Sequence, residues 1–201
     1  TLGILKTILQ KDLDINLTEL IKKSISILPV KVEDENKLYN NVREFFEQRL
    51  IVFLSDKYKH DVLEACISEK DVLSNLKDLM KRLSIVSDIV KKENYGQFHE
   101  AINRIIRIIK NETEFGVVDS NLFNTNSEME LWNKATAIKE KELSYDKLEK
   151  ALIDLIPCIS DFFDKVLVMD KDEEVKQNRI NLLNTVKQKF AVIADFSKIV
   201  F

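Results

Sequence analysis

The residues best suited to acid–base or metal chemistry are two histidines, His60 and His99, and two cysteines, Cys66 and Cys158. A catalytic zinc site usually takes three protein ligands, often two of them on one helical turn, and no such spacing occurs here. His60 and Asp61 resemble the metal-binding dipeptide of a phosphohydrolase, but the further His and Asp ligands of such a site are missing. We interpret the pair as the start of a helix, whose dipole favours an acid in the first turn. Both cysteines lie in apolar helical stretches, where thiols are unreactive. The sequence therefore predicts no catalytic residue, no metal site and no cofactor.

The composition excludes several other classes of protein. Only 3 Gly and 2 Pro occur in 201 residues, whereas β-sandwiches and barrels need such residues in frequent turns. The three glycines lie far apart in the chain, so a glycine-rich phosphate loop is also excluded. No apolar run approaches the roughly 18 residues of a membrane span. Two distant cysteines are typical of reduced thiols, and we expect a cytoplasmic protein.

The net charge of −3, from 31 Lys and Arg against 34 Asp and Glu, does not indicate a polyanion partner for the whole molecule. A nucleic-acid site would have to be a local basic patch.

Helical periodicity dominates the chain and predicts an all-α bundle of eight or nine helices. An S-x-x-E capping box at Ser127–Glu130 starts one of them, and Pro157 predicts a kink inside another. We expect three parts: residues 1–28 are the tail of an upstream domain or the start of the bundle, residues 29–97 are a helical connector or half of the bundle, and residues 98–201 are a helical domain. The predicted helices cover residues 2–11, 17–28, 37–54, 61–68, 71–91, 97–110, 127–139, 144–168 and 172–197.

Two arginines fall inside the apolar stripes of their predicted helices, Arg49 near Leu38 and Arg179 near Val175. An arginine keeps its charge and must therefore find an anion. One interpretation is a buried ion pair with a carboxylate of a neighbouring helix. The other is that the arginine is presented to an external phosphate or base.

A basic face is predicted on the helix over residues 97–110. Arg104, Arg107 and Lys110 are spaced by three residues, opposite an isoleucine face, and we find no acid between them. Such a stripe of cations suits a phosphate backbone. The alternative is an ordinary solvated basic surface.

Several segments resemble the β subunit of bacterial glycyl-tRNA synthetase, in the same order and with similar spacing. Family patterns that read LGILRIILE, LDLDL, AxKRVxNIL and FFDxVMVM have counterparts along nearly the whole chain. The matching stretches are LGIL (2–5), DLDI (12–15), FFEQRL (45–50), HDVLEA (60–65), AINRIIRII (101–109), FFDKVLVM (162–169) and QNRINLL (177–183). Lys176, Asn103 and Arg107 depart from the family, which usually has Arg, Lys and Asn at these positions. The basic content of the helix over 97–110 is thus kept but moved.

The resemblance implies a C-terminal fragment with an all-helical anticodon-binding region of the DALR type over residues 98–201. It implies binding of tRNA-Gly, with no DNA or membrane partner, and aminoacylation and ATP binding in a separate α subunit of a complex of two α and two β subunits. The residues expected to bind tRNA are Arg104, Arg107, Lys110, Lys176, Asn178 and Arg179, and Arg49 is expected to be structural or tRNA-binding. The alternative function is an all-helical protein-interaction scaffold with no nucleic-acid role.

Overall fold

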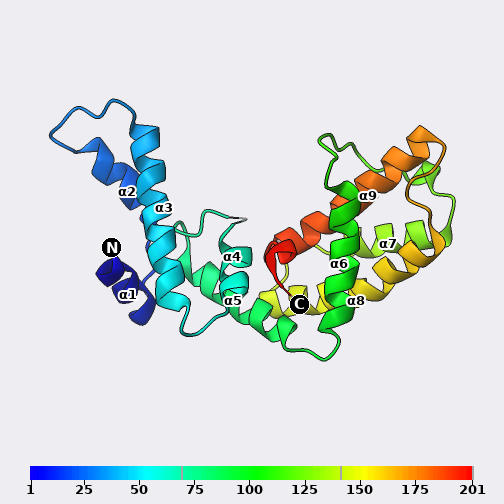
Figure 1. Cartoon of the computed structure of the whole chain (residues 1–201), viewed down its shortest axis with the longest axis horizontal. Helices are drawn as coiled ribbons and strands as arrows, with labels where there is room; N and C mark the ends of the chain where they lie inside the picture. The colour runs from blue at the N-terminus through cyan, green and yellow to red at the C-terminus, as the bar shows by residue number, and fades with distance from the viewer. Residues whose placement is uncertain (69, 141, 201) are drawn as a thin grey trace. The chain divides into compact units, whose positions relative to one another are not determined.

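The computed structural model describes residues 1–68, 70–140 and 142–200, and within them the chain forms nine α-helices, two short 3₁₀ helices and no strand (Figure 1). The prediction of an all-α protein is confirmed. The chain divides into two compact units, Thr1–Ser87 and Asp88–Phe201. The three-part division drawn from the sequence stays a prediction. No helix in the described ranges is long and apolar enough to cross a bilayer.

Unit 1 is built around the long helix α3, which packs against α1, α2 and α4. The side chains of Asn16 and Asp34 cap α2 and α3 by accepting hydrogen bonds from the backbone N–H groups of Glu19 and Lys37. Leu50 and Leu63 are completely buried in its core. The helices are α1 (Leu2–Gln10), α2 (Leu17–Ser26), α3 (Glu35–Leu54), α4 (His60–Ile67) and α5 (Leu76–Val90), the last of which continues past the unit boundary.

A buried arginine that the sequence analysis did not single out lies in unit 1. Arg82 has no exposed surface, and its Nε donates to Asp78 Oδ2 at 2.7 Å while its Nη1 donates to the carbonyl oxygen of Cys66 at 2.6 Å. Burial raises the pKa of the Cys66 thiol to about 12 against an opposing effect of Arg82, so this thiol stays protonated at neutral pH. That agrees with the expectation that Cys66 is unreactive.

Unit 2 contains four long helices, with α8 packed against α6 and α7, and α9 packed against the same two helices (Figure 1). An aromatic cluster of Phe98, Phe190 and Phe196 joins α6, α9 and the 3₁₀ helix η2. The elements are α6 (Tyr95–Ile109), η1 (Ser120–Leu122), α7 (Asn126–Ala137), α8 (Tyr145–Lys165), α9 (Glu173–Ala191) and η2 (Phe196–Lys198).

The predicted capping box at the start of α7 is wrong by two residues. Thr125 and Glu128 form the box instead, and Ser127 donates from its Oγ to Asp161 Oδ2 at 2.6 Å. The sequence T-x-x-E at 125–128 carries the same capping-box signature as the S-x-x-E at 127–130, so the sequence alone is compatible with either start of the helix.

Three predicted helix boundaries also differ. Helix α5 begins at Leu76 rather than at residue 71. The carbonyl of Leu73 accepts a hydrogen bond from the N–H of Leu17, and the side-chain oxygen of Asn75 caps the start of α5 by accepting from the N–H of Asp78. Helix α9 ends at Ala191, and η2 follows in place of a continuous helix to 197. Helix α8 ends at Lys165 and is assigned without interruption through Pro157.

Candidate nucleic-acid interface

Arg179 is the centre of a buried charged cluster in unit 2. Only 4% of the residue is exposed, and its Nε donates to Glu128 Oε1 at 2.7 Å. Its Nη1 donates to Asp170 Oδ2 at 2.6 Å and to the carbonyl oxygen of Leu167 at 3.0 Å. Arg179 therefore joins the start of α7, the segment between α8 and α9, and α9 itself. Of the two interpretations of this arginine, the buried ion pair with a neighbouring helix is the one that the geometry supports.

Glu128 carries the other half of this cluster and has no exposed surface. Burial acts to raise the pKa of its carboxyl group. Hydrogen bonds from Arg179, from Thr125 and from the Asn124 N–H outweigh burial and hold the pKa below its usual range. The carboxylate is therefore ionised at neutral pH, and both of its oxygens accept hydrogen bonds. Glu128 thus cannot act as a general acid or base at neutral pH.

Asn178 and its neighbours on α9 hold the segment that follows α6. The Asn178 amide accepts from the Asp119 N–H at 2.8 Å and donates to the Asp119 carbonyl at 2.9 Å. One turn on, Asn181 Oδ1 accepts from the Gly116 N–H at 2.9 Å. A Cβ at Gly116 would approach the Asn181 side chain to 3.2 Å, so a larger residue there would have to displace the amide. In this structure Asn178 acts as a backbone clamp.

The position of Lys176 is less enclosed. Its Nζ forms an ion pair with Glu173 at 2.9 Å, one turn earlier on α9. The Glu173 side chain is 80% exposed, so this pair contributes little to stability. Lys176 could exchange this partner for a phosphate.

The expectation that Arg49 lies within an apolar stripe is wrong. Arg49 is exposed, and its guanidinium carbon lies 5.0 Å from the ring centroid of Phe45, itself 44% exposed. The face of α3 that is buried instead carries Phe46, Leu50 and Leu54. Arg49 belongs to unit 1.

The basic residues of α6 do not form a uniform stripe. Arg107 and Lys110 are exposed, and the Arg107 Nε donates to the Asn103 carbonyl at 3.3 Å. Arg104 is half-buried against α8, with its guanidinium 4.4 Å from the Phe163 ring centroid and 3.9 Å from Asp164 Oδ1. No acid lies between these three cations in the sequence, as expected, but two carboxylates lie beside Arg104. Glu100 lies one turn before Arg104 on the same helix face, and Asp164 reaches Arg104 from α8.

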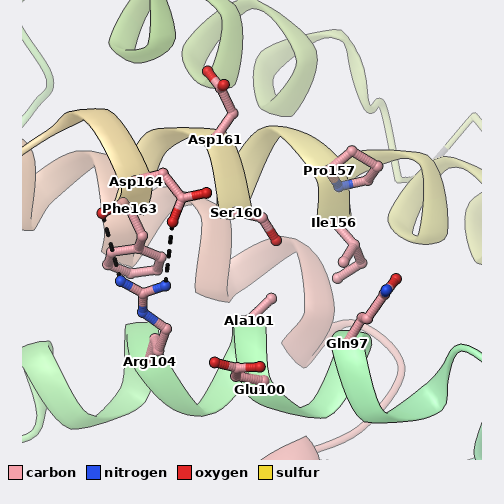
Figure 2. A pocket seen from close by; sticks show the side chains of 10 residues that line it. All are labelled: Gln97, Glu100, Ala101, Arg104, Ile156, Pro157, Ser160, Asp161, Phe163 and Asp164. Carbon is pink, nitrogen blue, oxygen red and sulfur yellow. Dashed lines mark hydrogen bonds and ion pairs between the residues drawn. The ribbon is translucent and has the colours of Figure 1, made fainter.

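A pocket of about 520 Å³ lies between α6 and α8 beside Arg104. Figure 2 shows Arg104 at one end of the pocket and Gln97 at the other. Ser160 of α8 points into the space between the helices, whereas Asp161 points away from it. Asp161 is bonded to Ser127 and Lys165. The pocket has the volume of a small-molecule site and a polar lining. No group of three His, Cys, Asp or Glu residues within the described part of the chain could hold a metal ion.

Comparison with known proteins decides the family. Residues 98–196, which run from α6 to the first residue of η2, match the model of the DALR anticodon binding domain. Residues 98–196 belong to the DALR anticodon binding domain family. The DALR domain thus accounts for most of unit 2, including the Arg179 cluster and the α6–α8 pocket.

The whole chain is related to one enzyme subunit. It is similar to glycine–tRNA ligase beta subunits of Aquifex aeolicus (32% identity), Dictyoglomus turgidum (32%) and Rickettsia prowazekii (29%). Each alignment covers 98% of this chain but only 28–30% of the relative's length. The family resemblance drawn from the motifs is confirmed, and the chain corresponds to part of such a subunit.

We expect Arg179→Leu to destabilise the DALR domain by about 3–5 kcal/mol, because it leaves the buried Glu128 carboxylate without its cation. Urea denaturation followed by the fluorescence of Trp132, the single tryptophan, on α7, would measure this. Arg107→Leu is the matched control on an exposed arginine and should shift the free energy of unfolding by about 0.5 kcal/mol or less. Equal unfolding midpoints for the two variants would contradict the buried-pair interpretation.

The lowered pKa of Glu128 also predicts a pH dependence. A carboxyl whose pKa is lower in the folded than in the unfolded state stabilises the fold fully above its ordinary value of 4.5. This contribution is lost as the pH falls through the lower folded value. The difference in unfolding free energy between the natural protein and Glu128→Gln should therefore be constant near pH 7 and shrink below pH 4.5. A difference that stays constant down to the acid transition would show that Glu128 is not held ionised by the cluster.

Proposed function

We propose that this chain binds tRNA-Gly at its anticodon arm, as part of the beta subunit of a glycine–tRNA ligase. The observation that carries this proposal is the match of the DALR anticodon binding domain to the helices that build unit 2. The relatedness of the entire chain to glycine–tRNA ligase beta subunits supports glycine as the amino acid concerned.

The chemistry of α6 fits a contact with the RNA backbone. Its isoleucine face is buried, with Ile102, Ile105 and Ile109 in the core, so the helix is fixed in the domain. Arg107 and Lys110 project from the opposite side without a carboxylate partner among the described ion pairs. Cations held on a rigid element and open to solvent can replace the counterions of a phosphate chain.

In our proposal, Arg179 and Asn178 have a structural role within the domain. The Nε and Nη1 groups of Arg179 and the amide of Asn178 bond within the domain, so in our proposal both residues position the segments around α9 and do not reach the RNA. Lys176, with its solvated partner, is the α9 residue we assign to phosphate contact.

The wider assembly is proposed on the same family grounds. Glycine activation and ATP binding would reside in an alpha subunit, in a cytoplasmic complex of two alpha and two beta subunits, and this chain would need no cofactor. It would carry no aminoacylation chemistry of its own.

A salt titration tests the proposal against a scaffold without a nucleic-acid role. Filter binding of tRNA-Gly at several KCl concentrations should give an affinity that falls steeply with salt. Arg107→Gln with Lys110→Gln should lower the slope of log affinity against log salt by about 1–2, since each lost phosphate contact removes about 0.7–0.9. The loss should be similar for tRNAs with altered anticodons, because phosphates carry no sequence information.

The matched control is Lys147→Gln with Lys150→Gln, two exposed lysines in the first turns of α8. This pair should leave the slope unchanged. Loss of affinity and slope to the same extent in both double variants, or in neither, would reject α6 as the phosphate surface. A natural protein that fails to bind tRNA-Gly at low salt would reject the proposed function.

A further inference from the structure

An apolar groove in unit 1 lies outside the surface that we assign to RNA. It has a volume of about 450 Å³ and is formed by α1, α2 and α3, where α1 and α2 each pack on α3 (Figure 1). Its floor includes the buried side chains of Leu17, Ile21 and Phe46, and no charged residue lines it within the described part of the chain. Because the groove has no cation to contact a phosphate, an RNA backbone does not fit it.

The rim of this groove is also apolar, and it is open to solvent. Ile4 of α1 is 49% exposed, Leu20 of α2 is 51% exposed, and Leu28, just after α2, is 44% exposed. Ser24 is the polar residue of the lining, and its Oγ already donates to the Leu20 carbonyl of the same helix at 2.8 Å. A contiguous apolar surface of this kind marks a place where another protein element packs.

The walls of the groove have the spacing that receives a helix. On α2, Leu20 and Ser24 line it one turn apart. On α3, Leu38, Val42 and Phe46 line it at intervals of four residues. Rows of side chains at this spacing form ridges, and a further helix packs its own ridge into the groove between them. An amphipathic helix would cover the rim with its apolar face and keep its polar face in water.

The length of the relatives indicates where such a helix comes from. The alignments cover 98% of this chain but only 28–30% of each relative, so the relatives carry the counterpart of α1, α2 and α3 within a much longer polypeptide. Thr1 directly precedes α1, and Ile4 follows it by three residues. A segment joined to Thr1 would therefore start about 5 Å, along the helix axis, from the rim of the groove.

We propose that this groove is an interface within the beta subunit, covered by the apolar face of an amphipathic helix from the part of the subunit that lies outside these 201 residues. A segment of the same polypeptide has a high effective concentration at the groove, which a separate molecule lacks. This inference rests on one part of the proposed function, namely that the chain belongs to a longer beta subunit. It does not depend on tRNA binding, since no residue of the groove is assigned to RNA.

The experiment places single cysteine reporters on the rim. Leu20→Cys and, separately, Ile4→Cys are introduced into the 201-residue chain and into the complete beta subunit that contains it. Mass spectrometry follows the alkylation of each reporter by iodoacetamide. In the 201-residue chain both reporters should react at the rate of an exposed thiol. In the complete beta subunit without an alpha subunit both should react more slowly by about tenfold or more, because the reagent must wait for local opening of the interface.

Ser26→Cys, at an exposed position on the side of α2 turned away from the groove, is the matched control and should react at the same rate in both proteins. Circular dichroism would verify that each variant is folded.

Equal rim labelling in the 201-residue chain and in the complete beta subunit would overturn the proposal. Rim protection that is already present in the 201-residue chain and rises with its concentration would assign the groove to a second copy instead. Protection that appears only after an alpha subunit is added would assign it to that subunit, and either result would also overturn the proposal. All of these outcomes leave tRNA binding to be decided by the salt titration.

Discussion

The DALR domain is organised by the need to keep one buried arginine paired. Arg179 cannot lose its proton, and the fully buried Glu128 beside it is held ionised, so neither charge has water to solvate it. Removing ions from water costs several kcal/mol each, and only good geometry with further hydrogen bonds offsets that cost. The Thr125 cap, Asp170 and the Leu167 carbonyl supply those bonds. The positions of α7, α9 and the segment before α9 are thereby coupled.

This constraint separates the arginines of the domain into two kinds. The Nε and Nη1 groups of Arg179 donate to protein acceptors, so Arg179 serves the internal arrangement. Arg104 has long and partly solvated partners, and Arg107 donates to a backbone carbonyl of its own helix. Charges of the second kind can exchange their partners for a ligand at small cost, since exposed ion pairs contribute about 0–1 kcal/mol. The surface that we assign to RNA is the one whose arginines have the weakest contacts within the protein.

The sequence predicted most of what depends on local periodicity and less of what depends on contacts between helices. The helices and the apolar faces of α6 and α9 follow from spacing, and the ion pair of Arg179 was one of two open interpretations. The expectation that Arg49 lies in a buried apolar stripe was wrong because its apolar neighbours Phe45 and Val52 are themselves exposed. Glu100 was overlooked although its spacing of four from Arg104 was visible. The pairing of Arg104 with Phe163 and Asp164, and the burial of Arg82 against the Cys66 carbonyl, arise from packing of distant segments that no single-helix pattern contains.

The central claim is that Arg107 and Lys110 of α6, together with Lys176 of α9, meet the anticodon arm while the Arg179 cluster stays internal. Backbone amide chemical shifts of the ¹⁵N-labelled chain, recorded during titration with the tRNA-Gly anticodon hairpin, test it most directly. The account predicts saturable shift changes concentrated in residues 97–110 and in the first turn of α9 around Lys176, with little change at residues 17–54 in unit 1. Changes concentrated in α2 and α3, or an unperturbed α6 at saturation, would contradict it.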